Sequence, residues 1–226
     1  MTDGLDREER DDAIRRARSV ARLRDLARGC RACDLWQRAT QTVFGEGPTD
    51  ARLMIVGEQP GNTEDLEGVP FVGSAGRLLD RALDDAGVDR ASAYLTNVVK
   101  HFKWRRARTG KKRIHDKPDR AEVEACRPWL EAEAAHIRPE LIVCLGATAA
   151  QALLGRDFRV TRQHGNVIDS DLGPVLATIH PSAVLRAPDD TRDEMYAGMV
   201  EDLRAAATWL ASRDRSHTSA DGNGAT

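Results

Sequence analysis

The sequence of 226 residues contains no run of about 18 consecutive apolar residues, which excludes an ordinary membrane-spanning helix. Its N-terminal segment, MTDGLDREERDDAIRRARS, also lacks the apolar core of a signal peptide, so we expect a cytoplasmic protein. Net charge is nearly absent too, because 34 lysines and arginines are offset by 36 aspartates and glutamates. Against this nearly neutral total, the concentration of positive charge at residues 101–118 stands out.

Cysteine is scarce, with only Cys30, Cys33, Cys126 and Cys144 present. In a reducing cytosol, four cysteines indicate a metal centre more often than disulfides. Cys30 and Cys33 form a Cys-x-x-Cys pair that precedes every strand-like segment, which disfavours a thioredoxin-type dithiol. Cys126 and Cys144 could equally be small buried core residues. The spacing alone leaves both interpretations open, and it does not distinguish zinc from an iron–sulfur cluster.

Short apolar segments alternate with amphipathic ones along the chain. Strands are predicted at residues 52–58, 93–99, 140–146 and 175–181. Helices are predicted at residues 11–28, 74–86, 119–137 and 191–211. This order predicts an α/β fold with three layers, α/β/α, around a central, mostly parallel four-stranded sheet.

The chain shows no internal repeat and no sign of a second domain. We therefore expect a single domain over residues 1–211. Residues 212–226, with the sequence SRDRSHTSADGNGAT, contain no large apolar side chain, so we expect a disordered tail there.

Polar residues follow three of the predicted strands. Ligands of parallel sheets bind at the carboxyl ends of the strands, where the sequence places Glu58 and Gln59 in GEQPG, Asn97 in TNVVK, and His180 and Ser182 in HPS. Each motif also has an ordinary structural explanation, as a strand-to-loop turn, a capping asparagine or a His-Pro turn. No motif is decisive by itself.

Two further residues flank these strand ends. Gly57 permits close backbone approach to a ligand, and Phe71 lies on a glycine-flanked loop. An exposed loop aromatic can stack on a nucleic-acid base, although such residues more often belong to the core.

One stretch, HFKWRRARTGKKRIHDKP at residues 101–118, concentrates positive charge. It contains eight basic residues: Lys103, Arg105, Arg106, Arg108, Lys111, Lys112, Arg113 and Lys117. Such a run is usually a solvated face or a nucleic-acid contact without sequence specificity. His115 would then be a base or nucleophile beside the bound ligand.

Taken in order, these motifs resemble the uracil-DNA glycosylase superfamily, and the resemblance covers about Cys30 to Leu210. Cys-x-x-Cys, GEQPG, PFVGSAG, TNVVK, the two later cysteines and HPS are similar to its iron–sulfur-containing family 4 branch. Gln59 in GEQPG and the basic KKRIH loop resemble the UdgX group, which binds uracil-DNA covalently.

The resemblance implies a structural [4Fe–4S] cluster held by Cys30, Cys33, Cys126 and Cys144. It also implies uracil-containing DNA as the partner, single-stranded and also double-stranded, bound by a nucleoid-associated protein. We expect a monomer and no membrane association.

The resemblance also assigns roles in excision. Glu58 and Gln59 would lie at the scissile bond, Phe71 would stack on the flipped uracil, and Asn97 would hydrogen-bond its edge. His180 would stabilise the departing uracil anion, so that Glu58 and His180 offset opposite charges that develop in the transition state.

In the UdgX group, the loop histidine that matches His115 attacks the sugar and forms a covalent adduct, which ends turnover. Lys111, Lys112 and Arg113 would position this loop. Two departures stand out: Lys112 replaces the arginine of KRRIH and cannot form a bidentate fork, and Asn62 follows GEQPG where the group has aspartate.

Two other functions remain open. A conventional family 4 glycosylase would release uracil over many turnovers, with His115 only contacting DNA. A non-catalytic DNA-binding module with a four-cysteine metal centre would bind any DNA in a salt-sensitive way, and would have no need of Asn97, Phe71 or His180.

Overall fold

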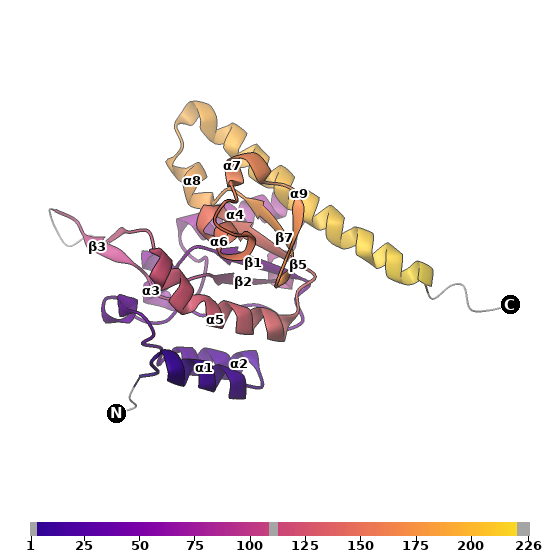
Figure 1. Ribbon diagram of the computed structural model, residues 1–226. Coiled ribbons are helices and arrows are strands. Elements are labelled where there is room, and N and C mark those ends of the chain that lie inside the picture. The colour runs from indigo at the N-terminus through magenta and orange to yellow at the C-terminus, as the bar shows by residue number, and fades with distance from the viewer. Residues whose placement is uncertain (1–3, 109–112, 221–226) are drawn as a thin grey trace.

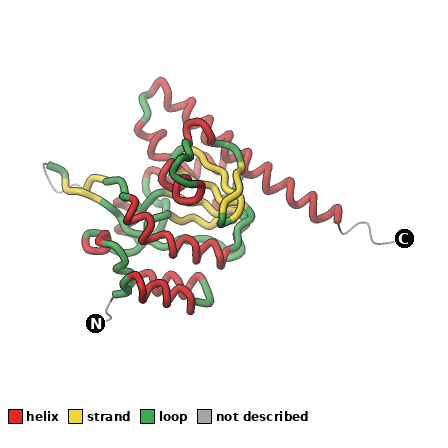
Figure 2. The backbone as a smooth tube through the Cα atoms, in the orientation of Figure 1, coloured by secondary structure: helices red, strands yellow, loops and turns green. Residues whose placement is uncertain are grey.

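The central sheet of the computed structural model, which describes residues 4–108 and 113–220, has five strands in the order β2-β1-β5-β7-β6 (Figures 1 and 2). These are β1 Leu53–Gly57, β2 Ala93–Asn97, β5 Leu141–Leu145, β6 Val167–Ser170 and β7 Gly173–Thr178. The first four in spatial order are parallel, and β6 pairs with β7 antiparallel. The expectation of an α/β fold with a mostly parallel sheet is confirmed.

The prediction of four strands omitted β6. This strand has four residues at the edge of the sheet, none of them fully buried. Its sequence, VIDS, therefore lacks the continuous apolar pattern that marks strands covered on both faces. Pairing with β7, which only the tertiary fold supplies, makes it a strand.

Helices cover both faces of the sheet, as the prediction of three layers required. One face packs against α5 Arg120–Ile137, α6 Gly146–Leu154 and α7 Val160–Gln163. Helices α1 Arg7–Arg16 and α2 Val20–Ala27 pack against α5 and against each other (Figure 1). The other face packs against α4 Ser74–Asp85, α8 Pro181–Arg186 and α9 Asp189–Ala220. Short helical segments also occur at α3 Asn62–Glu67, η1 Asp34–Gln37 and η2 Arg90–Ser92.

The predicted helix over residues 11–28 is divided into α1 and α2 in the structure. Helix α1 ends at an extended Ala17, and the side chain of Ser19 accepts a hydrogen bond from the Arg22 amide to begin α2. A serine in extended conformation stabilises a new helix start more than it stabilises a helix interior. The helical spacing of apolar residues continues across Ala17 and Ser19, so the sequence pattern predicts one helix where the structure has two.

Helix α9 continues to Ala220, beyond residue 211, where we expected the domain to end. It projects from the body of the protein toward the C-terminus (Figure 1). Once a helix is nucleated, each further residue adds a hydrogen bond at little cost, so a polar segment can extend a helix that is anchored elsewhere. Residues 221–226 of the expected tail lie outside the described residues.

The basic stretch forms a β-hairpin beside the sheet. Its strands are β3 Trp104–Arg106 and β4 Arg113–His115, with Trp104 opposite His115. Figure 1 shows it projecting from the body near α3. Among the described residues, no helix combines the length and apolar character needed to cross a membrane.

A buried ion pair joins the end of β2 to α5. The side chains of Lys100 and Glu133 are 1% and 0% exposed and form an ion pair. Glu133 Oε1 also accepts hydrogen bonds from the Gly45 amide and the Tyr94 hydroxyl, both at 3.0 Å. Lys100 Nζ donates to the Asn97 carbonyl at 2.7 Å, so this network fixes the residue at which β2 ends.

Replacing Glu133 by alanine would leave the Lys100 ammonium buried without a counter-charge. We expect Glu133→Ala to lower the free energy of unfolding by about 3–5 kcal/mol in chemical denaturation. Glu131→Ala breaks an exposed Arg127–Glu131 pair on the same helix and should cost no more than about 1 kcal/mol. Equal losses in the two variants would contradict this assignment.

Candidate active site

The carboxyl ends of β1, β2 and β7 bring Glu58, Asn97 and His180 to one edge of the sheet. Strand β1 ends at Gly57, and Glu58 follows it. The hydroxyl of Thr148, in the first turn of α6, donates a hydrogen bond to Glu58 Oε2. This contact orients the carboxylate and leaves its other oxygen facing the hairpin.

Gly57, Phe71 and Asn97 form a close cluster beside this carboxylate. A methyl group at Gly57 would lie 2.4 Å from Asn97 Oδ1 and 2.6 Å from the Phe71 ring, so only glycine fits there. Phe71 has a left-handed backbone, with φ of 57°, and is 6% exposed. Left-handed φ is uncommon for a bulky residue and is maintained only by surrounding packing. The fold therefore holds this ring against the amide of Asn97 and the end of β1.

His180 is held as a neutral imidazole with its proton on Nε2. Its Nδ1 accepts a hydrogen bond from the Ser182 amide at 3.1 Å, and an amide can only donate. Burial lowers the pKa of His180 to about 4, with the charges of Arg186 and His115 acting in the same direction. Nε2–H is therefore the group that His180 can offer to a developing anion.

His115, at the end of β4, lies across from Glu58. Its Nε2 is 3.4 Å from Glu58 Oε1, and the two side chains are 49% and 20% exposed. Burial is the main effect that lowers the pKa of His115, while the Glu58 carboxylate opposes that shift. The geometry places an accessible, largely neutral imidazole beside a carboxylate oriented by the sheet.

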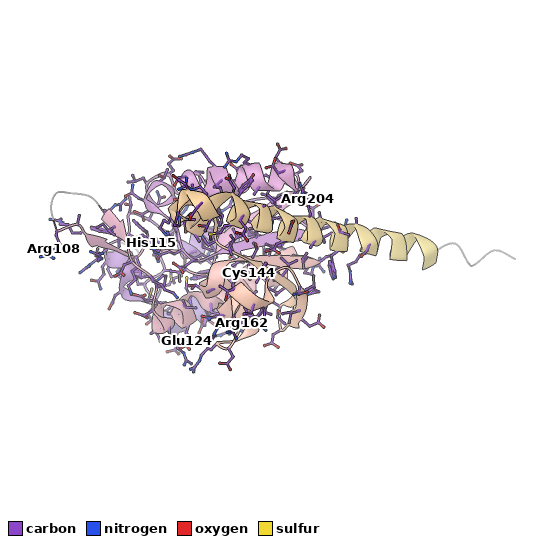
Figure 3. All side chains as sticks on the ribbon, turned by 90° about the horizontal axis from the view of Figure 1, so that it is seen from above. Arg108, His115, Glu124, Cys144, Arg162 and Arg204 are labelled. Carbon is purple, nitrogen blue, oxygen red and sulfur yellow. The ribbon has the colours of Figure 1, made fainter. Side chains whose placement is uncertain are left out.

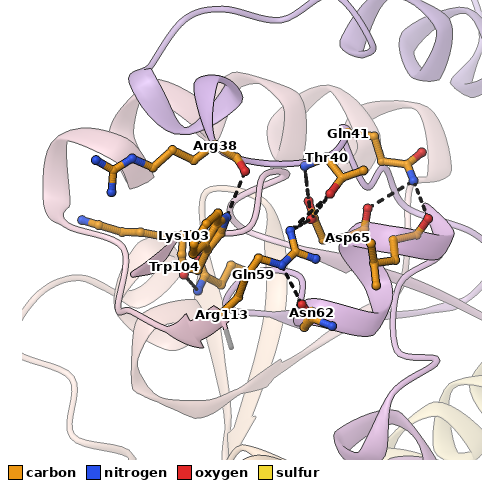
Figure 4. A network of polar contacts seen from close by, with 10 residues as sticks. Arg38, Thr40, Gln41, Gln59, Asn62, Asp65, Lys103, Trp104 and Arg113 are labelled. Atoms are coloured by element: carbon orange, nitrogen blue, oxygen red, sulfur yellow. Dashed lines mark hydrogen bonds and ion pairs between the residues drawn. The ribbon is translucent and has the colours of Figure 1, made fainter. Parts of the chain in front are cut away.

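Gln59 ties together the two ends of the hairpin (Figure 4). Its Nε2 donates to the carbonyl oxygens of Lys103 at 3.2 Å and Asp116 at 3.0 Å. Its Oε1 accepts from the Lys103 amide at 2.9 Å. Gln59 is 7% exposed, so its amide is engaged with the backbone on either side of the hairpin rather than directed at an open space.

Arg113 anchors the hairpin from the other strand. Its Nε donates to Asn62 Oδ1 at 2.7 Å, and its NH1 pairs with Asp65 Oδ2 at 2.6 Å and donates to Thr40 Oγ1 at 3.2 Å (Figure 4). The buried carboxylate of Asp65 is 0% exposed. Arg113 thus holds the hairpin through contacts with Asn62, Asp65 and Thr40, and Asn62 is an acceptor in the place where the UdgX group has aspartate.

The remaining predicted loop residues divide into two groups. Arg105, Arg106 and Arg108 are exposed, and Arg108 lies at the outer part of the hairpin, farther from the body than His115 (Figure 3). Lys111 and Lys112 lie outside the described residues.

The four cysteines are free thiols, all in or near the core that faces α5. Trp129 Nε1 donates to Cys30 Sγ at 3.3 Å, and the Lys100 amide donates to Cys126 Sγ at 3.2 Å. Burial raises the pKa of Cys126 to about 12, and the charges of Cys30 and Cys33 act in the same direction. Burial alone raises the pKa of Cys144. Cys30, Cys33 and Cys126 therefore act on one another electrostatically.

The donor chemistry of Cys30, Cys33 and Cys126 fits an iron–sulfur cluster, because thiolates are its usual ligands. Within the described parts of the chain, no three histidine, cysteine, aspartate or glutamate side chains converge as ligands of a single metal ion. In an iron–sulfur cluster the ligands bind different irons, so the ligand atoms lie farther apart than those around a single metal ion. The grouping of three thiols is compatible with such a spacing.

The sequence profile of the Uracil DNA glycosylase superfamily matches residues 44–204. This chain belongs to that superfamily. It is 38% identical to the type-4 uracil-DNA glycosylase of Thermotoga maritima over 183 residues, which are 80% of this chain and 89% of the relative. It is also similar to the type-4 enzymes of Pyrobaculum aerophilum (38% identity, 75% and 86% coverage) and Archaeoglobus fulgidus (40%, 74% and 84%).

Sequence reasoning missed two contributors to this glycosylase-like site, Thr148 and Asp65. Thr148 contacts Glu58 from a helix that follows another strand, and Asp65 contacts Arg113 from 48 positions away. Neither residue lies in a sequence motif that indicates catalysis or ligand binding. The pairing of a buried aspartate with a loop arginine required the tertiary fold.

Removing the Arg113 guanidinium would free β4 from α3. Because hydrogen bonds to charged groups contribute about 1.5–3 kcal/mol, we expect Arg113→Ala to accelerate amide exchange at Asp116 by about 10- to 100-fold. Hydrogen exchange read by mass spectrometry measures this, with Arg106→Ala on the exposed side of β3 as the matched control. Unchanged protection in Arg113→Ala would show that Arg113 does not anchor the hairpin.

Proposed function

We propose that this protein excises uracil from DNA and is then captured by its product, through a bond between His115 and C1′ of the sugar. The observation that carries the proposal is the 3.4 Å approach of His115 Nε2 to Glu58 Oε1, at the strand ends that also carry Asn97 and His180. Membership of the uracil-DNA glycosylase superfamily supports the excision step.

The cluster of Gly57, Phe71 and Asn97 would receive the flipped base. The Phe71 ring offers a stacking face, and the Asn97 side chain offers both a donor and an acceptor for a base edge. The absence of a side chain at Gly57 lets the Phe71 ring and the Asn97 amide pack closely against the end of β1.

Glu58 and His180 would divide the charges of bond cleavage. As the bond from C1′ to uracil N1 breaks, its electron pair leaves with uracil, and the sugar becomes cation-like. The Glu58 carboxylate stabilises that cation, and the Nε2–H of His180 donates to the uracil anion.

His115 would complete the reaction in the position where other glycosylases place water. A neutral ring nitrogen uses its lone pair to form the new bond to C1′, and the other ring nitrogen then releases its proton to solvent. Gln59 and Arg113 act as positioning residues, because they hold the hairpin whose last strand residue is His115. After this proton loss, breaking the new bond would expel an imidazolide anion from C1′, which is a poor leaving group, so turnover stops.

DNA binding would come from the exposed basic face of the hairpin. Arg105, Arg106 and Arg108 can neutralise phosphates without reading sequence. Single-stranded uracil-DNA suits this site, and double-stranded DNA does so after base flipping. A structural [4Fe–4S] cluster, when bound to the cysteine group, would stabilise the packing of the Cys30 segment on α5.

A second candidate is a multiple-turnover glycosylase, which the similarity to type-4 enzymes favours. In that case His115 would contact DNA without forming a bond, and free uracil would accumulate in excess of protein.

The decisive variant is His115→Ala. With a uracil-containing oligonucleotide, we expect the wild-type protein to form a band of protein plus DNA that survives a denaturing gel, and His115→Ala to form none. His136→Ala, at the far end of α5, should keep the band. An adduct of undiminished yield in His115→Ala, or uracil release well above one equivalent from the wild type, would overturn capture by His115.

The capture rate should depend on pH through His115. Protonated imidazole has no lone pair to donate, and burial lowers the pKa of His115 below 6.5. The neutral form therefore predominates above that lowered pKa, and capture should rise with pH through a midpoint below 6.5 and then stay level. Single-turnover adduct formation from about pH 5 to pH 8 measures the midpoint. A midpoint above that of free histidine would contradict the proposed environment.

A further inference from the structure

We infer that the groove between α5 and α6 binds the DNA strand on one side of the target uridine, as a subsite for flanking nucleotides. This inference rests on the proposed action on uracil-DNA, and it assigns a ligand to a cavity that the proposed reaction does not use.

The groove has a volume of about 670 Å³ and lies on the face of the sheet that packs against α5 and α6. Helix α5 forms one wall and α6 forms the other. Lys117 lines the groove just before α5 begins, and Arg156 lines it just after α6 ends. A cavity of this size is in the range of sites that bind organic ligands rather than single ions.

The groove is continuous with the candidate active site. Thr148, which lines the groove, donates its hydroxyl proton to Glu58 Oε2. Lys117, which also lines it, follows His115 by two residues in the chain. A strand whose uridine lies between Glu58 and His115 therefore has its neighbouring nucleotide at the mouth of the groove.

The length of the groove suits a short piece of strand. Thr148 and Leu153 both line it from α6, and five residues of an α-helix rise by about 7.5 Å. Successive nucleotides of a stacked strand are about 3.4 Å apart. The wall formed by α6 is therefore long enough for two nucleotides beside the reacting one.

Two cations of the groove are available to phosphates. The side chains of Lys117 and Arg156 are exposed and form no ion pair with the described residues. The other two cations that line the groove, Arg120 and Arg127, pair with glutamates on the same helix. An unpaired ammonium and an unpaired guanidinium can each neutralise one phosphate, which positions a strand without reading its sequence.

The acidic side chains of the groove oppose this charge only in part. Asp119 pairs with Lys103 at 3.3 Å, and Glu124 pairs with Arg120. Asp171, in the turn between β6 and β7, is exposed and forms no ion pair with the described residues. The Asp171 carboxylate would therefore repel a phosphate in the groove, and its removal should strengthen binding.

The groove also offers an apolar surface to a base. Val123 of α5 and Ala152 and Leu153 of α6 line it, and all three are half-buried against the core. With the phosphates at Lys117 and Arg156, a flanking base would lie against these side chains. Because bases are distinguished by hydrogen bonds to their edges, this apolar wall accepts any of them.

The experiment measures affinity for single-stranded oligonucleotides by fluorescence anisotropy. Each oligonucleotide carries one deoxyuridine fluorinated at C2′, because the fluorine disfavours the sugar cation and slows excision. The uridine is placed internally, at the 5′ end or at the 3′ end, so that strand flanks it on both sides or on one side only.

Lys117→Ala, Arg156→Ala and Asp171→Asn are compared with the wild-type protein. The matched control is Arg204→Ala, which removes one positive charge from α9. In Figure 3, Arg204 and the groove residue Glu124 lie on opposite sides of the protein. Circular dichroism of each variant shows that it is folded.

We expect each lost phosphate contact to lower the slope of log affinity against log salt by about 0.7, which corresponds to about five-fold weaker binding at ~0.1 M salt. Lys117→Ala and Arg156→Ala should show this loss with the internal uridine and with one of the two terminal uridines. The loss should disappear with the other terminal uridine, which has no strand in the groove. Asp171→Asn should bind more tightly, and Arg204→Ala should bind as the wild type does.

Equal losses with all three oligonucleotides would indicate a general attraction for DNA and would overturn the subsite. Wild-type affinity in both Lys117→Ala and Arg156→Ala, or weaker binding by Asp171→Asn, would overturn it as well. Binding of these uridines requires no bond to His115, so the subsite is tested whether or not the adduct forms on the denaturing gel. A wild-type protein that binds none of the three oligonucleotides would overturn DNA as the partner.

Discussion

The candidate site depends on the three hydrogen bonds by which Gln59 holds both ends of the hairpin. Gln59 directly follows Glu58, so the carboxylate and the hairpin share one anchor at the end of β1. Movement of the hairpin away from the sheet would break these bonds together. An exposed hairpin residue, His115, can therefore lie at a defined 3.4 Å from a carboxylate that belongs to the sheet.

The charges of the basic stretch serve two different purposes in the structure. Arg113 and His115 are two residues apart on β4, and side chains two apart in a strand lie on the same face. The inward face thus carries both the anchor, which pairs with Asp65, and the imidazole that faces Glu58. The exposed arginines of β3 remain available to phosphates. The total positive charge of the stretch does not distinguish Arg113, which binds Asp65, from the exposed arginines of β3.

Buried polar groups connect the segment after β2 to helix α5. Lys100 neutralises Glu133 through its side chain and contacts Cys126 through its amide, while its ammonium also donates to the Asn97 carbonyl. The position of Asn97, which we propose to bind the base, and the position of Cys126 are therefore determined by the same short segment after β2. In a close-packed interior, a change at one of these positions is transmitted to the other.

The sequence by itself determined the elements and their chemistry: the apolar runs that become β1, β2, β5 and β7, and the residues at their carboxyl ends. Those residues meet because parallel strands end at one edge, which the alternation of strands and helices already predicts. Only the tertiary structure decided the partners across long separations, such as Arg113 with Asp65, Glu58 with Thr148, and His101 with Thr42. It also decided that β6 is a strand and that α1 and α2 are separate helices. Local spacing encodes periodicity and caps, but pairings between distant segments depend on how the layers pack, and that packing is a property of the whole chain.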